Sequence, residues 1–167
     1  SYQVNGKKLT QMMNHVRSFK IDALHQTFLS ISMQNQFQIL FKNEVVFSQN
    51  EISLFVVDSN FNYAILVQEQ EFKQIFHVLN LETLKLEAEL SYSGELHFVE
   101  IVDNIIHINL IRGKNHVILL YDYVQKIQTF ERIVEGENHI HSKLGKNRIA
   151  ILDDSKSDEQ IENIELA

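Results

Sequence analysis

Four histidines in the second half of the sequence come closest to a metal-binding set. They are His97, His107, His139 and His141. Imidazole is a common zinc ligand, and His139 and His141 alternate along a predicted strand, so their side chains share one face. The spacing also has a simpler explanation, because Gly94-x-x-His97 recurs 42 residues later as Gly136-x-x-His139. We therefore interpret these histidines as structural or surface residues and predict no metal site.

The other polar motifs do not form a catalytic centre. The segment "DDSKSDE" (153–159) has oxygen ligands suited to calcium, but it lacks the glycine and terminal glutamate of an EF-hand loop. "RGKNH" (112–116) and "LGKNR" (144–148) lack the Walker spacing and a following helix, so we interpret them as turns. Glu87 and Glu89 share one face of a predicted strand, as in a solvent-facing pair. The sequence contains neither Gly-x-Ser-x-Gly nor His-Glu-x-x-His, so we predict a non-enzymatic protein with no catalytic residues and no cofactor.

The composition is that of a folded domain with an acidic balance. Of the 167 residues, 44% are apolar, and the net charge of −7 makes nucleic acid an unfavourable partner. Residues 1–20 contain four basic residues and no acidic one, whereas 153–165 contains six acidic residues and one base. The absence of Cys excludes disulfides and thiolate metal sites. With no apolar run long enough to span a membrane and no signal-type segment, we expect a soluble protein of the cytoplasm.

Segment 1–26 is predicted to be an amphipathic helical unit. Apolar residues recur at helical spacing along 8–19, after an Asn5-Gly6 pair that can cap the start. The stripe consists of Leu9, Met12, Met13, Val16 and Phe19. The helix either docks on the protein's own core or presents its apolar face to a partner groove or a membrane surface.

From residue 27 onward the periodicity changes to that of strands. Short β-rich runs alternate with Asn, Asp, Gly, Ser and Lys, and the short connections favour antiparallel neighbours. The predicted strands are 27–33, 37–42, 45–48, 52–57, 63–68, 75–81, 85–90, 96–102, 105–111, 117–122, 127–134, 139–144, 148–152 and 160–166. The predicted fold class is all-β with one N-terminal helix.

The predicted strands repeat with a period close to 42 residues. Asn80 and Asp122 are 42 positions apart, each at the end of the third strand of a unit, and Asn163 follows 41 positions later. The units span about 27–49, 52–90, 96–134 and 139–166. Four antiparallel strands every 40–45 residues are the blade of a β-propeller. The sequence therefore predicts tandem four-stranded antiparallel units that form a partial β-propeller.

These motifs distantly resemble those of the WD40 family. Tyr121-Asp122 stands where that family has Trp-Asp, at the end of the third strand, and Gly94-x-x-His97 and Gly136-x-x-His139 stand near its Gly-His pair. Trp is absent, and Gly and His are not adjacent. In the other units the Trp-Asp position is occupied by Leu79-Asn80 and Glu162-Asn163. The resemblance covers about residues 27–166 and implies a propeller whose corresponding histidines make structural hydrogen bonds near the blade junctions.

The predicted role is a non-catalytic protein–protein interaction scaffold within a multi-protein assembly, because rigid blades present loops and edges to partners. The alternative is a nucleic-acid-binding OB-like β-barrel that uses the basic N-terminal segment, although the net charge and the number of strands argue against it. The last predicted strand, 160–166, stands one strand short of the repeat. It carries Ile161 on one face and Ile164 and Leu166 on the other. We expect another polypeptide to pair at this edge, with helix 8–19 as a further partner contact.

Overall fold

The computed structural model describes residues 15–136, 140–154 and 160–166, and these residues form strands and turns without any helix. The strands form four separate antiparallel sheets, named A to D in chain order, and within each sheet consecutive strands pair with each other. Sheet A consists of β1 (Val16–Asp22), β2 (Thr27–Ser32), β3 (Phe37–Phe41) and β4 (Glu44–Gln49). Sheet B consists of β5 (Leu54–Val57), β6 (Tyr63–Gln70), β7 (Lys73–Asn80) and β8 (Lys85–Ser93). Sheet C consists of β9 (Glu95–Val102), β10 (Ile105–Arg112), β11 (Asn115–Asp122) and β12 (Ile127–Glu135), and sheet D of β13 (Ile140–Gly145), β14 (Arg148–Asp153) and β15 (Gln160–Glu165).

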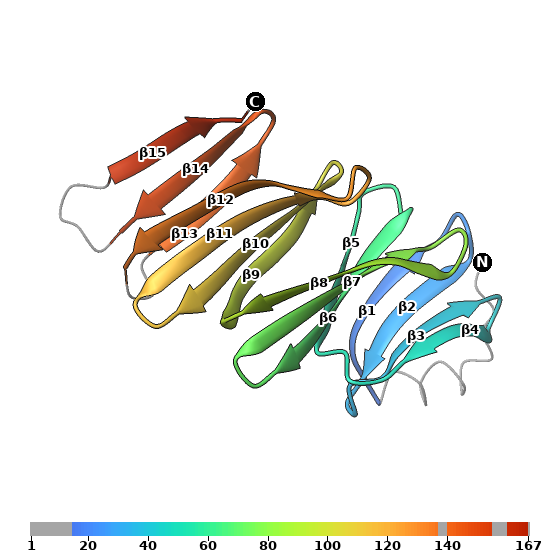
Figure 1. Cartoon of the computed structure of the whole chain (residues 1–167). Coiled ribbons are helices and arrows are strands. Elements are labelled where there is room, and N and C mark those ends of the chain that lie inside the picture. The colour runs from blue at the N-terminus through green and yellow to red at the C-terminus, as the bar shows by residue number, and fades with distance from the viewer. Residues whose placement is uncertain (1–14, 137–139, 155–159, 167) are drawn as a thin grey trace.

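The four sheets follow one another across the molecule in chain order, with sheets A and D at opposite ends of this row (Figure 1). Within each sheet the strands are ordered as in the sequence, and every pairing is antiparallel, as predicted. A meander of antiparallel strands repeated sheet after sheet is the arrangement of propeller blades. The OB-like alternative does not fit, because its five strands form one barrel whereas the described strands form four separate sheets.

An apolar core lies at each junction between consecutive sheets. Between sheets A and B it includes Phe37 and Phe55, whose rings meet edge to face at 5.2 Å. Alternate residues of β11 contribute to the cores at the next two junctions, B–C and C–D. Val117 and Leu119 pack toward sheet B, while Ile118 packs toward sheet D. Strand β11 is therefore apolar on both faces because it lies between two neighbouring sheets.

The predicted helix 8–19 is wrong in its described part. Residues 16–22 form strand β1, which pairs along its length with β2. The ring of Phe19 on β1 stacks on that of Phe28 on β2, with 5.7 Å between centroids. Aromatic and β-branched residues also suit the pleated surface of a strand, so pairing with β2 decides between a helix and a strand for this segment. The rest of the predicted helical segment, residues 1–14, lies outside the described residues.

Backbone hydrogen bonds recur with the period of the sequence. In each linker that leaves a four-stranded sheet, one N–H donates to a carbonyl in the turn between that sheet's second and third strands. These pairs are Ile52 to Asn35, Gly94 to Phe72 and Gly136 to Lys114, at 2.9, 2.9 and 3.0 Å. A second set joins the residue after the third strand to the turn between the first two strands. These pairs are Leu81 to Asn62, Tyr123 to Asn104 and Leu166 to Asn147, at 2.9, 3.1 and 2.9 Å. The two sets define equivalent positions in successive sheets.

Candidate functional site at the junction of sheets C and D

The two glycines that carry the family resemblance lie in linkers between sheets. Gly94 has a φ of +125°, and a Cβ at this position would lie 2.9 Å from the carbonyl oxygen of Ile111. Gly136 is confined as well, since its Cβ would lie 2.8 Å from the side chain of Ile140. The first linker therefore needs both the conformational freedom and the small size of glycine, and the second needs the small size.

Asp122 ends the third strand of sheet C and organises the turn that follows. Its Oδ1 accepts hydrogen bonds from two backbone N–H groups of that turn at 2.9 and 2.8 Å, and its Oδ2 accepts one from Asn104 Nδ2 at 2.7 Å. In sheet B, Oδ1 of Asn80 likewise accepts from two backbone N–H groups of its turn, each at 3.0 Å. Asn80 and Asp122 are therefore equivalent residues at the ends of third strands in separate sheets, as predicted.

The prediction that Asn163 is the third member of this set is wrong by two residues. Asn163 lies inside β15, where it pairs with Ala150 of β14. Leu166 makes the backbone hydrogen bond that Tyr123 makes in sheet C. The residue equivalent to Asp122 is consequently Glu165.

The structure places three of the four predicted histidines at the junction of sheets C and D. His97 lies on β9, His107 on β10 and His141 on β13. The ring centroids of His97 and His141 are 6.3 Å apart. The fourth histidine, His139, lies outside the described residues. The junction therefore gathers imidazoles from two sheets.

His107 connects the two sheets through a partly buried series of hydrogen bonds. Its Nδ1 lies 3.0 Å from Glu100 Oε1, and its Nε2 lies 2.8 Å from Ser142 Oγ. A carboxylate, an imidazole and a hydroxyl in this order also make up a hydrolase triad. Because His107 has no exposed surface, its Nε2 is closed to a substrate. The series therefore fastens β9 and β10 of sheet C to β13 of sheet D.

His116 joins this group and was missed by sequence reasoning. It lies on β11 with no exposed surface, and its ring is 5.2 Å from that of His97. Its Nδ1 is 3.0 Å from Asn109 Oδ1, whereas its Nε2 is buried without a hydrogen-bond partner. The signal in the sequence was the alternation of His116 with Ile118 and Leu120, two residues that pack toward sheet D.

Burial favours the neutral form of both inner histidines. Desolvation lowers the pKa of His107, and Glu100 opposes this shift. Desolvation also lowers the pKa of His116, and the nearby rings of His97 and His141 lower it further. A neutral imidazole carries a lone pair on one of its two ring nitrogens, so each ring can accept a hydrogen bond or bind a cation there.

The two glutamates predicted at a solvent face have separate partners. Glu87 accepts a hydrogen bond from Asn80 Nδ2 at 2.8 Å, and Glu89 lies 3.5 Å from His77 Nδ1.

Only the first two residues of the acidic segment 153–159 are described. As placed, no three His, Asp or Glu side chains in the described ranges lie close enough together to hold a metal ion.

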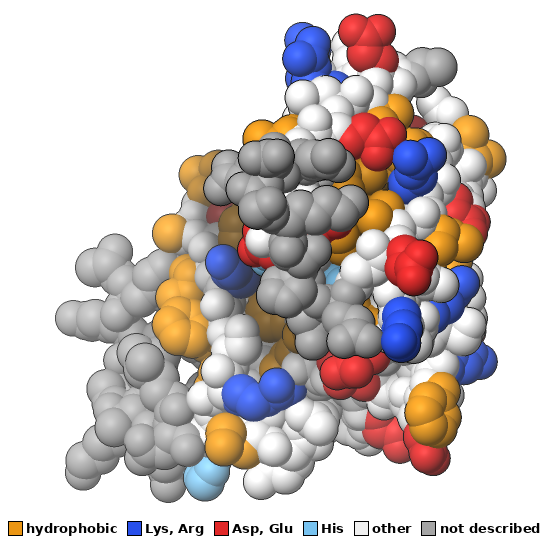
Figure 2. All heavy atoms as spheres, turned by 90° about the vertical axis from the view of Figure 1, so that its left-hand side faces the viewer, with side chains coloured by type: hydrophobic (Ala, Val, Ile, Leu, Met, Phe, Trp, Pro, Cys, Tyr) orange, Lys and Arg blue, Asp and Glu red, His pale blue; other side chains and the backbone are white. Residues whose placement is uncertain are grey.

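Within the described ranges, sheet D is one strand narrower than the other sheets, and its last strand is exposed. β15 pairs with β14 only. Ile161 has 57% of its surface exposed on the outward face, whereas Ile164 and Leu166 pack on the core shared with sheet C. Figure 2 views the molecule from this end, where hydrophobic, acidic and basic side chains are interspersed. Among the described residues, this surface combines a strand edge without a partner strand and an exposed apolar residue.

Two clefts open where the turns of adjacent sheets meet. They have volumes of about 520 Å³ between sheets A and B and about 420 Å³ between sheets C and D. Between sheets B and C, Tyr123 packs its ring 4.8 Å from that of Tyr63 and donates its hydroxyl to the carbonyl of Asp103 at 3.0 Å. Burial raises the pKa of Tyr123 to about 12. Leu81 and Leu166 hold the equivalent positions at the other junctions, and each lines one of the clefts.

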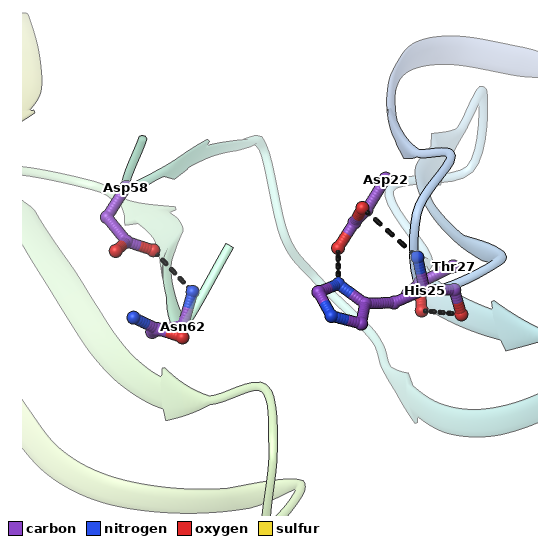
Figure 3. A network of polar contacts seen from close by, with 5 residues as sticks. All are labelled: Asp22, His25, Thr27, Asp58 and Asn62. Atoms are coloured by element: carbon purple, nitrogen blue, oxygen red, sulfur yellow. Dashed lines mark hydrogen bonds and ion pairs between the residues drawn. The ribbon is translucent and has the colours of Figure 1, made fainter. Parts of the chain in front are cut away.

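Polar turns from two sheets border the A–B cleft (Figure 3). In sheet A, Asp22 accepts a hydrogen bond from the backbone N–H of His25 at 3.3 Å and contacts its ring Nδ1, and Thr27 Oγ1 donates to the His25 carbonyl at 3.2 Å. In sheet B, Asp58 Oδ1 accepts from the N–H of Asn62 at 2.7 Å. Desolvation raises the pKa of Asp22, but the hydrogen bonds and charge of His25 lower it overall. These contacts fix the shape of both turns.

Several solved β-propellers are similar in structure to this chain. The β-propeller domain of the Trilobed protease from Pyrococcus furiosus has a TM-score of 0.60 at 10% identity, over 92% of this chain and 57% of that one. Sqt1 from Saccharomyces cerevisiae has a TM-score of 0.59 at 6% identity, over 87% and 44%. The β-propeller domain of Cps50 (Swd1) from Myceliophteria thermophila has a TM-score of 0.56 at 9% identity, over 83% and 49%. No protein-family model and no curated protein matches the sequence.

Identities this low show the fold alone. The chain has the fold of consecutive propeller blades, and the distant resemblance to WD40-type propellers is confirmed. It spans about half the length of the propellers that it matches. In the described segments no helix has the length and apolar character required to cross a bilayer.

Proposed function

We propose that this chain is a non-catalytic, propeller-type interaction module that binds other proteins within a multi-protein assembly. The supporting observation is the uncovered side of sheet D. Its strand β15 has one paired edge, and Ile161 is 57% exposed on its outward face. Unpaired strands with apolar side chains favour pairing with a further strand.

The partner at this surface is an extended segment with alternating apolar side chains. Pairing with β15 would satisfy its outer backbone groups. In sheet C the fourth strand pairs with β11 and directs Phe130 and Val134 to the face on which Ile118 lies. By analogy, a partner strand at β15 would place apolar side chains beside Ile161, on the outward face of sheet D.

A partner contact through helix 8–19 is not expected, because residues 16–19 belong to strand β1. Nucleic acid is not expected either, given the net charge of −7. The hydrogen-bonded Glu100, His107 and Ser142 resemble a hydrolase triad, but the buried ring of His107 is inaccessible to a substrate. This burial supports a non-enzymatic role. Location in the cytoplasm remains a prediction from the sequence.

The test measures mass in solution by light scattering over a range of protein concentrations. Strand pairing at β15 predicts association that rises with concentration. Ile161→Lys places a charge on the outward face and should reduce this association, since charged residues protect edge strands. The matched control is Ile133→Lys on β12, because Ile133 is also 57% exposed and β12 is likewise an edge strand, but one that belongs to a four-stranded sheet.

Two outcomes would contradict the proposal. One is a chain that stays monomeric at all concentrations with slowly exchanging amides throughout 160–166. The other is association that both lysine variants reduce equally, because that result would assign no special role to sheet D.

A further inference from the structure

Three imidazoles from three strands converge at the junction of sheets C and D. They belong to His97 on β9, His116 on β11 and His141 on β13. The ring of His97 is 5.2 Å from that of His116 and 6.3 Å from that of His141. His97 therefore lies beside both other rings, and the charges of His97 and His141 both lower the pKa of His116.

A hydrogen bond fixes the tautomer of the innermost ring, that of His116. Asn109 Oδ1 can only accept a hydrogen bond, so the 3.0 Å contact requires that His116 Nδ1 carries the hydrogen. Nε2 of the neutral ring then carries a lone pair. This atom is buried and lacks a hydrogen-bond partner. A buried polar atom in this condition costs free energy unless a ligand engages it.

His141 is oriented in a comparable way. Its Nε2 lies 3.3 Å from Asp154 Oδ2, a carboxylate oxygen that accepts a hydrogen. Donation from Nε2 leaves the lone pair of the neutral ring on Nδ1. Histidines that bind metals almost always donate their second ring nitrogen to a carboxylate, a carbonyl or water, which fixes both the tautomer and the ring direction. Both His116 and His141 therefore have an oxygen acceptor of the kind that supports a metal ligand.

We propose that His97, His116 and His141 bind a divalent transition-metal ion of the zinc class, with His116 Nε2 as the fixed inner ligand. Neutral imidazoles suit zinc, and three protein ligands leave a fourth position for water or another donor. With Zn–N distances of about 2.0 Å and a tetrahedral angle, two bound imidazole rings lie about 5 Å apart. The separation of His97 and His116 already agrees with this value.

Among the described residues, these three side chains do not all lie within reach of one metal ion. His97 and His141 are both exposed, so each can rotate toward His116 without breaking the packed core. A bound ion would join β9 and β11 of sheet C to β13 of sheet D. It would hold in place the sheet whose outer strand we propose as the docking surface, but the metal site does not depend on that function.

The test is a titration of the tag-free chain with Zn²⁺ by calorimetry, accompanied by the visible spectrum of the Co²⁺ form. We expect one equivalent of metal and a spectrum of a four-coordinate site with nitrogen and oxygen ligands. His97→Ala and His141→Ala remove exposed side chains, so these variants should fold and should weaken binding by at least about tenfold. Asp154→Ala removes the acceptor of His141 and should also weaken binding by about tenfold.

The matched control is His25→Ala, which removes an exposed histidine with its own aspartate partner in sheet A. This variant should bind zinc like the parent. The site is refuted if the parent binds less than one equivalent, or if His97→Ala and His141→Ala bind as tightly as the His25 variant. Because the readout is metal binding, failure here leaves the partner-binding proposal for β15 unaffected.

Discussion

Strands β11 and β15 occupy the same position, the third strand, in sheets C and D. The backbone hydrogen bonds of Tyr123 and Leu166 set the equivalence, which makes Ile118 the counterpart of Ile161. Ile118 has none of its surface exposed, whereas Ile161 has 57% exposed. The same residue type at the same position thus has opposite environments.

The neighbours of the two strands explain this difference. β11 lies between β10 and β12 and has a sheet packed on each face, while β15 pairs with β14 and packs on one core only. Whether a strand in this row of sheets is buried depends on the strands that pair with it and the sheets that pack on its faces. The apolar pattern of the strand alone does not determine its burial. An apolar side chain that the repeat would bury is left at the surface in sheet D, which is why we place the partner there.

The largest expected effect comes from placing a charge at the equivalent isoleucines. Ile118→Asp buries an unpaired carboxylate and should lower the free energy of unfolding by about 4 kcal/mol or prevent folding. Ile161→Asp leaves the carboxylate in solvent and should change it by less than about 0.5 kcal/mol. Urea unfolding followed by circular dichroism measures both. Similar losses for the two variants would show that Ile161 is covered in solution.

The linker into sheet C should be the next most sensitive point. Gly94→Ala forces a side chain into a positive φ and against the Ile111 carbonyl, with an expected loss of about 1–3 kcal/mol. Gly145→Ala in sheet D meets its nearest neighbour at 3.8 Å, an ordinary contact, and should have a much smaller effect. The same unfolding assay compares them. Equal stability of the two alanine variants would argue against a constrained linker.

Substitutions at the ends of the two third strands should differ in their effect on the free energy of unfolding by a smaller amount. Asp122→Ala removes an acceptor of three hydrogen bonds and should cost about 1–2 kcal/mol. Glu165→Ala, at the equivalent position of exposed β15, should cost less than about 0.5 kcal/mol. Thermal unfolding of both variants measures the difference. A larger loss for Asn163→Ala than for Glu165→Ala would restore the register predicted from the sequence.

The smallest expected effect is a dependence of stability on pH. The pKa values of His107 and His116 are lowered in the folded protein, chiefly by desolvation, so the unfolded chain binds protons more readily. Their contribution is therefore fully present above the ordinary histidine pKa of 6.5 and is lost as the pH falls below it toward the folded values. His107→Gln should flatten this loss. A parent protein whose unfolding free energy rises on acidification from pH 7 to pH 5 would contradict the assignment.

Much of the fold could be predicted because its signals are local. Alternating apolar residues predict β11, and the 42-residue spacing of Gly94 and Gly136 corresponds to two linker glycines that make equivalent backbone hydrogen bonds. β1 was mistaken for a helix because Val16 and Phe19 are three residues apart, a spacing that fits the helical period. Only pairing with β2, a contact outside the segment itself, makes this segment a strand.

The candidate site was less predictable because its contacts join strands and sheets. His116 is the only histidine of β11 and precedes four apolar residues, and nothing in its spacing shows that Asn109 would lie beside Nδ1. The proximity of His97 to His141 arises only when sheet D packs on sheet C. The register of Asn163 failed because Asn163 follows Asp122 by 41 residues, whereas the equivalent position in sheet D follows it by 43.

Amide hydrogen exchange of β11 and β15 in one dilute sample tests the central claim most directly. If β15 is a third strand without its outer neighbour, its outward amides should exchange through local opening, at least about a hundredfold faster than those of β11. Amides of β11 should exchange only through global unfolding. Exchange in β15 as slow as in β11, in a chain that remains monomeric, would show that the strand is already covered and would contradict a docking surface on sheet D.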